Sequence, residues 1–209
     1  MKKWVFFDMM GVIFKVGDDT QDLLVPFVRK INGNIGQDHI TKIYMEASLG
    51  RISSKEFWQR AGVQGDHEIV EREYLDGHLT IDEQIIPVLL ALSREYNVGL
   101  LSNDVSEWSR FLRKKYGLDA FLKECVVSGD VHCRKPSQEI YEIALQKAGI
   151  PPRDCAFIDD RWKNIFPAQN LGMKVIKFNR EDDFDEMSEI PQASQLSDIP
   201  KILEEIFAE

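Results

Sequence analysis

The chain has 209 residues, of which 44% are hydrophobic, and its 26 basic and 35 acidic side chains give a formal charge of -9 at pH 7. That length and apolar content suit one globular domain with an insertion and exclude a disordered or fibrous chain. An acidic surface repels nucleic acid at long range, and every apolar run is far shorter than the roughly 20 residues of a membrane span. We therefore expect no nucleic-acid partner and no membrane insertion.

The start of the chain and its cysteines predict a cytoplasmic protein. The opening MKKW runs directly into Val5 and Asp8, without the apolar stretch of a secretory signal. The cysteines are odd in number, three in all, and include no C-x-x-C pair, which argues against a disulfide framework. We expect reduced thiols, and the sequence is compatible with either a monomer or a homodimer.

Five short, apolar and β-rich runs predict buried strands, at residues 4–7, 98–101, 125–127, 155–158 and 173–178. Segments with helical spacing precede the last four strands, at residues 85–96, 107–116, 138–148 and 164–170. This alternation indicates parallel βαβ units, so the predicted fold class is α/β with a Rossmann-like, doubly wound parallel sheet. After an acidic stretch at residues 181–186, apolar spacing from Ile199 to Ile206 predicts a last helix packed at the sheet edge.

Residues 15–83 interrupt this alternation, because they contain helical patterns but no convincing strand. Apolar spacing predicts helices at residues 23–31, 40–47 and 68–75. Ser53 followed by Glu56 forms a capping box before a further helix. We therefore expect a small helical cap at residues 15–83, inserted into a core domain of residues 1–14 and 84–209.

Polar side chains gather at the carboxyl ends of the predicted strands, which is where an open parallel sheet binds its ligands. They are Asp8 after the first strand, Ser102 and Asn103 after the second, Lys135 after the third, and Asp159 and Asp160 after the fourth. A pair of carboxylates binds Mg²⁺ through hard oxygen atoms, while a hydroxyl and an ammonium group hold phosphoryl oxygens. Asp8 is then free to attack phosphorus and form an aspartyl phosphate, because the cation offsets the repulsion between two anions.

Other polar residues near these strand ends are assigned structural roles. Asp104 is expected to cap the following helix, and Arg161 and Lys163 are expected on a solvated helix face. Tyr44 is expected to pack inside the helical insertion.

Four ordered motifs cover nearly the whole chain. They are FFDMMGVIF, LLSND, the RKP of HCRKPSQEIYEIAL, and FIDDRWKNIFPAQNLGMKVI. In order and spacing they resemble the four motifs of the haloacid dehalogenase-like (HAD) hydrolase superfamily, and the predicted helical cap stands where many members carry one. The stretch LGRISSKEFW also looks like the cap of a bacterial sugar-phosphate phosphatase subgroup.

The resemblance implies a role for each residue of the site. It makes Asp8 the nucleophile, and Ser102 and Lys135 the ligands of the phosphoryl group, with Asn103 as a secondary contact. The implied ligands of Mg²⁺ are Asp8, Asp159, Asp160 and the backbone carbonyl of Met10. The expected function is Mg²⁺-dependent hydrolysis of a phosphoric monoester, with a small phosphorylated metabolite as the substrate.

Met10 departs from the pattern of the superfamily. Most phosphatases of this kind have Asp two residues after the nucleophile, as general acid and base, and here that position is Met10. A thioether cannot carry a proton, and general acid–base catalysis is typically worth about 10² to 10⁴ in rate. The sequence leaves four explanations open: a slow phosphatase that uses water or another acid, a member with different chemistry, a binding protein without catalysis, or an alteration at this site.

Two other functions compete with the phosphatase. Met10 favours a non-catalytic module that binds a phosphometabolite or a protein partner. A 2-haloacid dehalogenase, in which Asp8 attacks carbon and displaces halide, would also lack the acid at position 10. Dehalogenases have little use for a divalent cation, however, so the pair Asp159 and Asp160 argues against that function.

Overall fold

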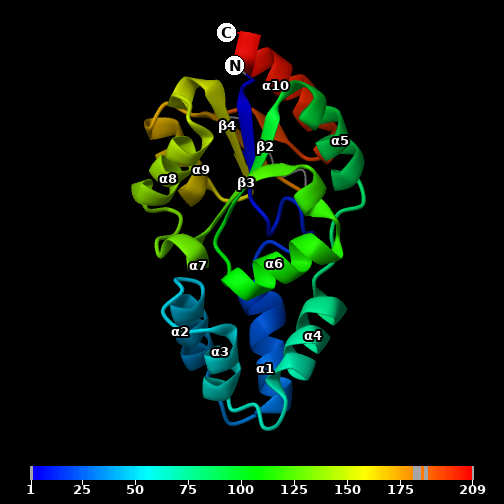
Figure 1. The fold of residues 1–209 in the computed structure, drawn as a ribbon, viewed down its shortest axis with the longest axis vertical. Helices are drawn as coiled ribbons and strands as arrows, with labels where there is room; N and C mark the ends of the chain where they lie inside the picture. The colour runs from blue at the N-terminus through cyan, green and yellow to red at the C-terminus, as the bar shows by residue number, and fades with distance from the viewer. Residues whose placement is uncertain (1, 181–184, 186–187, 209) are drawn as a thin grey trace.

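One parallel sheet organises the part of the chain that the computed structural model describes, which is residues 2–180, 185 and 188–208. Six strands in these residues follow the order β3-β2-β1-β4-β5-β6 (Figure 1). They are β1 (Trp4–Phe7), β2 (Asn97–Ser102), β3 (Leu122–Val127), β4 (Cys155–Asp159), β5 (Lys174–Phe178) and β6 (Gln192–Ala193). The predicted α/β class and the doubly wound parallel sheet are confirmed.

The strands differ from the prediction at one edge and at one strand start. β6 has two residues and pairs only with Lys177 and Phe178 of β5, so it carries no periodicity by which the sequence could reveal it. β3 begins three residues earlier than predicted, at Leu122. The first residues of β3 include the polar Lys123 and Glu124, which interrupt the apolar pattern because this end of the strand is partly exposed.

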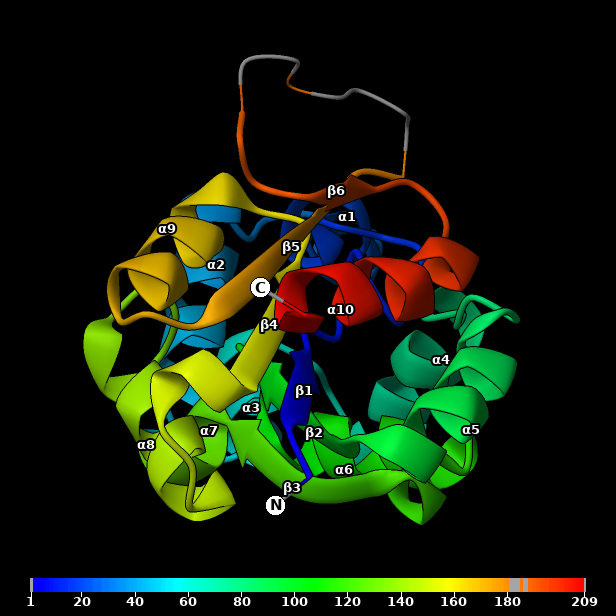
Figure 2. The ribbon, with the colours of Figure 1, turned by 90° about the horizontal axis from the view of Figure 1, so that it is seen from above.

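Helices cover both faces of the sheet (Figure 2). They are α5 (Ile85–Glu95), α6 (Ser106–Lys115), α7 (Ser128–Val131), α8 (Gln138–Ala148), α9 (Trp162–Asn170) and α10 (Ile199–Ala208), with 3₁₀ turns at Leu118–Ala120, Pro152–Asp154 and Leu196–Asp198. Alternate residues of β1 serve the two faces: Phe6 packs in one core with Tyr141 of α8, and Phe7 packs in the other core with Leu89 of α5. The sheet is therefore buried on both sides, as parallel sheets require.

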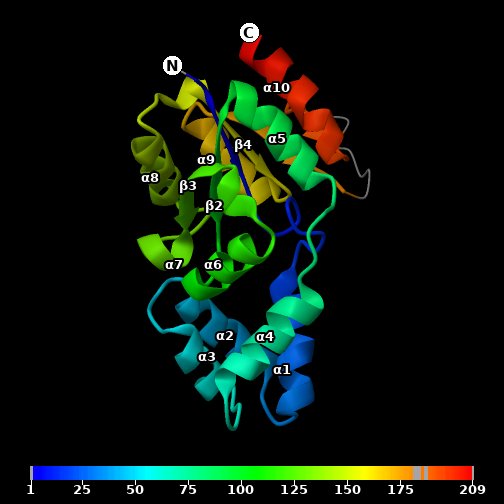
Figure 3. The same ribbon diagram turned by 45° about the vertical axis from the view of Figure 1, so that its right-hand side comes forward.

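Four helices of residues 20–78 lie beyond the carboxyl ends of the strands, at the end of the molecule opposite both termini (Figures 1 and 3). They are α1 (Val25–Ile31), α2 (Gln37–Ala47), α3 (Ser54–Arg60) and α4 (His67–His78), and a π-helical turn at Thr20–Leu24 precedes α1. The Ser53 hydroxyl accepts a hydrogen bond from the backbone N–H of Glu56 at 3.2 Å, as the predicted helix start requires. The boundaries of the cap stay a prediction.

Two connections join these helices to the sheet, and they run side by side. The backbone N–H of Lys15 donates to the carbonyl oxygen of Thr80 at 3.2 Å, and that of Asp82 donates to Ile13 at 2.9 Å. The side chain of Arg180, just after β5, binds the Asp82 carboxylate. The two crossings are thus fixed to each other and to the sheet edge.

A shared carboxylate also ties the inserted helices to the core. Glu71 Oε2 on α4 accepts from the indole N–H of Trp58 on α3 at 2.8 Å and from that of Trp108 on α6 at 2.7 Å. Both tryptophan side chains are buried, so Glu71 satisfies two donors that would otherwise be left without partners.

The last helix closes the apolar core. α10 buries Ile199, Leu203 and Ile206, which agrees with the predicted apolar spacing. The acidic stretch 181–186 lies outside the described residues except for Asp185. None of the described helices is both long enough and apolar enough to span a membrane.

Candidate active site

Two neighbouring strands bring the predicted catalytic acids together. β1 lies between β2 and β4, and Phe7 pairs with Ile158, so Asp8 and Asp159 follow each other at the same edge of the sheet. The backbone N–H of Asp8 donates to the carbonyl oxygen of Ile158 at 2.9 Å. The order of the strands reverses between β1 and β4, which is where sheets of this kind bind ligands.

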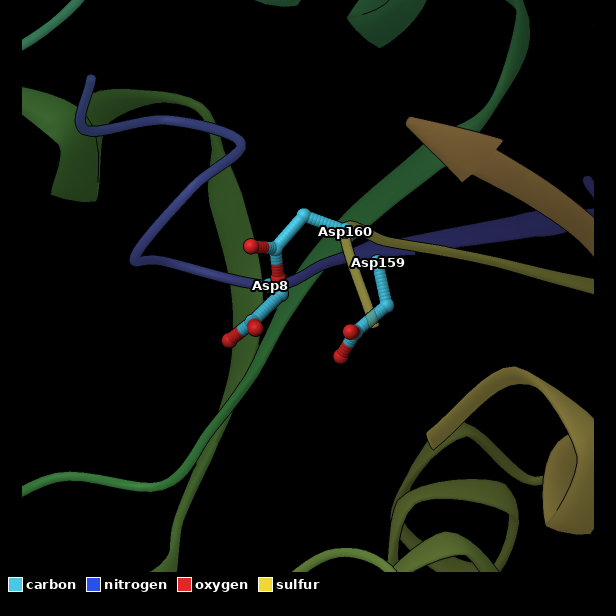
Figure 4. A group of neighbouring side chains, drawn as sticks. All are labelled: Asp8, Asp159 and Asp160. Atoms are coloured by element: carbon cyan, nitrogen blue, oxygen red, sulfur yellow. The ribbon is translucent and has the colours of Figure 1, made fainter. Parts of the chain in front are cut away.

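Asp8, Asp159 and Asp160 form a cluster of carboxylates at these strand ends, in which Asp8 and Asp159 are buried and Asp160 is partly buried (Figure 4). One oxygen from each side chain lies within 4.8 Å of the others. Burial raises the pKa of Asp8 well above its usual range; Lys135 opposes this shift, and the charges of Asp159 and Asp160 add to it. Burial and the charge of Asp159 raise the pKa of Asp160 to about 6. The cluster therefore carries more negative charge than the protein alone stabilises.

Asp160 fits a metal ion particularly well, because one of its oxygens is left without a partner. Its Oδ1 is buried and accepts no hydrogen bond from the residues that the structure describes, and Nε of Arg161 lies 3.9 Å away, beyond hydrogen-bond distance. Gly11 makes room for this carboxylate: its φ is +80°, and a Cβ atom there would stand 2.3 Å from Asp160 Oδ2. A hard cation would satisfy the free oxygen.

Lys135 supplies the positive charge beside the cluster. Its ammonium lies 2.8 Å from Asp8 Oδ1 and 2.7 Å from Asp159 Oδ2, and the side chain is 1% exposed. Burial lowers the pKa of Lys135, but Asp159 and Asp8 outweigh this effect and raise it above its usual value. Asn103 holds the backbone of Lys135 from both sides, since its amide donates to the carbonyl oxygen at 2.9 Å and accepts from the N–H at 2.8 Å.

Asp159 is the most firmly held of the three acids. The backbone N–H of Arg161 donates to its Oδ1 at 2.8 Å, and the side-chain amide of Asn164 lies 3.0 Å from both of its oxygens. Lys135 binds Oδ2 from the other side. From the sequence, Asn164 is predicted only to start a helix. Its position in the first turn after a strand that ends in an acid is the one signal that could have revealed its role.

Ser102 and Met10 lie where the motifs predict, with different access. Ser102 ends β2, is 1% exposed, and has an Oγ without a hydrogen-bond partner among the described residues. Met10 is 8% exposed and lines the cavity above Asp8. A thioether carries no exchangeable proton, so position 10 offers no acid to this cavity.

A cavity of about 330 Å³ opens above Asp8, between the core and the inserted helices. The core contributes Asp8, Met10, Asn103, Arg134, Lys135, Pro136, Arg161, Lys163 and Asn164, and residues 17–45 contribute Gly17, Asp19, Thr20, Tyr44 and Met45. Arg161 and Lys163 are predicted on a solvated face; Lys163 is exposed, as predicted, and Arg161 is partly buried, and both also line this cavity. The reason is that α9 starts directly after β4, so its first residues stay at the carboxyl edge of the sheet.

Two further buried acids, Asp104 and Asp19, have surroundings that the sequence does not predict. Asp104 Oδ1 accepts from the backbone N–H of Val105 at 2.7 Å but does not cap α6. Its Oδ2 is buried and has no partner in the described part of the chain. Asp19, which the sequence analysis does not single out, is 7% exposed and lines the cavity. Burial raises its pKa to about 7, although Arg161 opposes the shift. Only its place in a Gly-Asp-Asp turn before the first inserted helix could have drawn attention to it.

Comparisons with known proteins agree with this geometry. A family model described as haloacid dehalogenase-like hydrolase matches residues 2–172. The D-ribitol-5-phosphate phosphatase of Bacteroides thetaiotaomicron is 25% identical over 189 residues, which are 85% of this chain and 92% of that enzyme.

Solved structures show the same fold. A HAD family enzyme of Bacteroides thetaiotaomicron, in complex with magnesium and inorganic phosphate, superposes with a TM-score of 0.74 at 22% identity, over 90% of this chain and 99% of that one. A 2-haloacid dehalogenase of Pseudomonas syringae superposes with a TM-score of 0.73 at 17% identity, over 98% and 99% of the two chains. With a family model that spans most of its length, the chain belongs to the haloacid dehalogenase-like hydrolase family.

Proposed function

We propose that the protein is a Mg²⁺-dependent phosphatase that hydrolyses monoesters of a small phosphorylated metabolite through an aspartyl phosphate on Asp8. The observation that carries this proposal is the largely buried cluster of Asp8, Asp159 and Asp160 beside the buried ammonium of Lys135. Carboxylates packed this closely need a cation, and a lysine beside them provides for an anionic substrate. The similarity to a D-ribitol-5-phosphate phosphatase over most of both chains supports the same reading.

The residues present fit Mg²⁺. Asp8, Asp159, Asp160 and the backbone carbonyl of Met10 would hold the ion, and the unpartnered Oδ1 of Asp160 supports this set. All four ligands are hard oxygen atoms, which Mg²⁺ prefers. When bound, the ion supplies positive charge that reduces the repulsion between the Asp8 carboxylate and a phosphoryl group.

The hydrogen-bonding groups around Asp8 direct its attack. The backbone N–H of Met9 at 2.6 Å and the ammonium of Lys135 at 2.8 Å both bind Asp8 Oδ1, which leaves Oδ2 to form the bond to phosphorus. In the proposed mechanism Lys135 also stabilises the transferred phosphoryl oxygens. The Ser102 hydroxyl, which has no hydrogen-bond partner in residues 2–180, 185 and 188–208, donates to them. Asn103 positions Lys135 through its two backbone hydrogen bonds.

Residues 15–83 serve in this proposal as a cap that closes the cavity over the substrate and limits access of water. The enclosed volume of about 330 Å³ stands at the lower end of the range for small-molecule sites, so it favours a short metabolite over a nucleotide or a polymer. Arg134 and Lys163, which line the same cavity, add positive charge that attracts a phosphorylated ligand.

Met10 favours a second candidate, a module that binds a phosphometabolite without hydrolysing it. The cavity, Lys135 and the metal ligands would serve binding equally well, and the acid expected two residues after Asp8 is missing. The shared fold is compatible with dehalogenation. The unpartnered oxygen of Asp160 among the described residues, however, argues for a cation that dehalogenation does not need.

One assay separates these functions. Phosphate release is measured from p-nitrophenyl phosphate, glycerol phosphate and D-ribitol 5-phosphate, with Mg²⁺ or with EDTA, using the wild type and Asp8→Asn. Phosphatase chemistry predicts release that requires both Mg²⁺ and Asp8. Binding of phosphate without any release by folded protein supports the binding module, and metal-independent release of chloride from 2-chloropropionate supports the dehalogenase.

A further inference from the structure

The cavity above Asp8 lacks a proton donor where Met10 stands, although the proposed reaction needs one. A metabolite's alkoxide is a poor leaving group, and its departure from phosphorus is slow unless a positioned acid protonates it. The thioether of Met10 cannot do this. The donor must therefore come from another residue that reaches the same space.

Asp19 is the one other carboxyl group, besides Asp8, among the described residues that line this cavity. It is the N-cap residue of the π-helical turn before α1, so it reaches the cavity from the inserted segment and not from the strand end that carries Asp8. A leaving group lies on the side of phosphorus away from Asp8, because attack and departure are in line, so its proton donor must belong to another part of the cavity wall. Tyr44 is the other titratable residue that the inserted segment adds to the cavity wall. Its hydroxyl lies 3.5 Å from the carbonyl oxygen of Asn103, and burial raises the pKa of Tyr44 well above the usual value.

We propose that Asp19 is the general acid and base of the reaction, in place of the acid that Met10 has lost. This inference rests on the proposed phosphatase function. It makes Asp19 a catalytic residue that the cap contributes to the core.

The surroundings of Asp19 suit both roles. The titratable and charged groups that interact with it are Asp18 in its own turn, Arg161 before α9, Tyr44 on α2, Tyr74 on α4 and Asp104 before α6. Burial raises its pKa to about 7; Arg161 lowers it and Asp18 adds to the rise. The protonated and ionised forms are therefore both populated near neutral pH, as an acid that later acts as a base requires.

Asp19 gives up one proton and regains one over two steps. In the first, an Asp8 oxygen bonds to phosphorus, the ester P–O bond breaks, and its electron pair takes the proton of Asp19 to release the alcohol. In the second, ionised Asp19 takes a proton from water as the water oxygen bonds to phosphorus. The bond between phosphorus and Asp8 breaks, and phosphate leaves with Asp8 ionised and Asp19 protonated again.

The first test uses the wild type alone and so does not depend on the folding of a variant. Values of kcat/KM are measured from about pH 6 to about pH 9 with glycerol phosphate and with p-nitrophenyl phosphate, whose leaving group needs no acid. We expect the ratio of the two values, glycerol over p-nitrophenyl, to fall about tenfold for each pH unit above the pKa of Asp19. A ratio that stays constant over this range, or no hydrolysis of glycerol phosphate at all, would overturn the inference.

The second test compares Asp19→Asn with the matched variant Asp18→Asn, which removes the same charge from the neighbouring, half-exposed side chain. Asp19→Asn is expected to lower kcat/KM for glycerol phosphate by about 10²-fold or more but to change the value for p-nitrophenyl phosphate by less than about threefold. It should also release p-nitrophenol in a burst of one equivalent, followed by slow turnover, because the base of the second step is missing. Asp18→Asn should behave like the wild type.

Introducing Met10→Asp into Asp19→Asn should restore hydrolysis of glycerol phosphate, since it returns a carboxyl group to the cavity. Equal losses on both substrates would indicate a structural role for Asp19 and overturn the inference. If p-nitrophenyl phosphate is hydrolysed in an Asp8-dependent way while these signatures are absent, only this inference fails. A wild type that hydrolyses neither ester overturns the proposed function as well.

Discussion

Asn103 and Lys135 bind each other through two hydrogen bonds, because the amide of Asn103 donates to the carbonyl oxygen of Lys135 at 2.9 Å and accepts from its N–H at 2.8 Å. Lys135 in turn places its ammonium between Asp8 and Asp159. The side chain of a residue on one loop thus fixes the backbone that carries the proposed phosphate ligand on another. The relationship explains how a flexible side-chain type is held at one point in the site.

Replacing Asn103 by Ala is expected to loosen Lys135 and to lower both stability and turnover. Loss of these partners from partly buried backbone groups costs about 1–3 kcal/mol in the free energy of unfolding. Because a displaced ammonium stabilises the transferred phosphoryl group poorly, kcat should fall by about tenfold or more. Thermal unfolding and phosphate release measure the two effects, and Asn34→Ala at an exposed site is the control. Wild-type kcat in Asn103→Ala would contradict the positioning role.

Gly11 and Asp160 give a second prediction, which concerns space. Gly11→Ala should destabilise the protein and weaken Mg²⁺ binding, because the new Cβ would stand 2.3 Å from Asp160 Oδ2. Gly117→Ala is the matched control: its φ of +67° carries the same backbone strain of about 1–2 kcal/mol, but no atom lies within 4 Å of its Cβ. Calorimetric titration with Mg²⁺ should show weaker binding for Gly11→Ala alone. Equal behaviour of the two variants would argue against a steric role for Gly11.

The sequence predicts the sheet and the three acids because strand ends are local features. Apolar runs mark β1 and β4, and parallel strands bring their carboxyl ends to one edge, so Asp8 and Asp159 can be placed without knowing any side-chain contact. The resemblance of the four motifs predicts the family, and the family is confirmed. The roles of the individual site residues stay predictions.

The parts of the site that escape prediction depend on tertiary packing. Asn164 binds Asp159 only because α9 starts at the edge of the sheet, and Asp19 lines the cavity together with Asp8 only because the inserted segment packs against the core. Neither fact has a periodicity that the sequence could show. The prediction for Arg161 misses its position for the same reason. Its charge suggests a solvated face, whereas the turn after β4 places it at the cavity.

The third prediction concerns the metal. Adding Mg²⁺ to chelator-treated protein should raise the melting temperature, because a ligand that binds only the folded state stabilises it by about 2.7 kcal/mol at 100 times its Kd. Asp160→Asn should abolish most of this rise, since it removes the ligand whose oxygen is free. Without metal, the same variant should be as stable as the wild type or more so, because it relieves repulsion within the cluster. Differential scanning calorimetry at constant ionic strength measures both, and an equal Mg²⁺ effect in Asp160→Asn would contradict the proposed site.

The fourth prediction concerns pH. The pKa of Asp19 rises from 3.8 to about 7 on folding, so between these values the folded state binds more protons than the unfolded state. The stability linked to Asp19 is therefore fully present below about pH 4 and is lost as pH rises through about 7. Asp19→Asn, which imitates the protonated form, should remove this loss, and it should gain on the wild type by up to about 4 kcal/mol between pH 4 and pH 8.

Urea unfolding of metal-free protein at a series of pH values tests this expectation. Asp18→Asn is again the control, because Asp18 is half-exposed. The prediction fails if the wild type and Asp19→Asn show the same dependence of unfolding free energy on pH.

The last prediction concerns the attachment of the inserted helices to the core. Glu71 accepts from the indole N–H groups of Trp58 and Trp108 at 2.8 and 2.7 Å, so Glu71→Ala leaves two donors without partners. Each such donor costs about 1–3 kcal/mol, and we expect a clear fall in the free energy of unfolding. Trp108 lies on α6 and Trp58 on α3, so loss of the two hydrogen bonds should also weaken the packing of the inserted helices against the core.

Hydrogen exchange distinguishes this local release from a general loss of stability. In Glu71→Ala, amides of α3 and α4 should exchange faster relative to those of β1 and β4 than they do in the wild type. Glu73→Ala, an exposed glutamate on the same helix, should leave the pattern unchanged. Because the proposed cap must close over the cavity, KM should rise in Glu71→Ala. Uniform faster exchange across the sheet and the inserted helices would instead show that the two parts unfold as one unit.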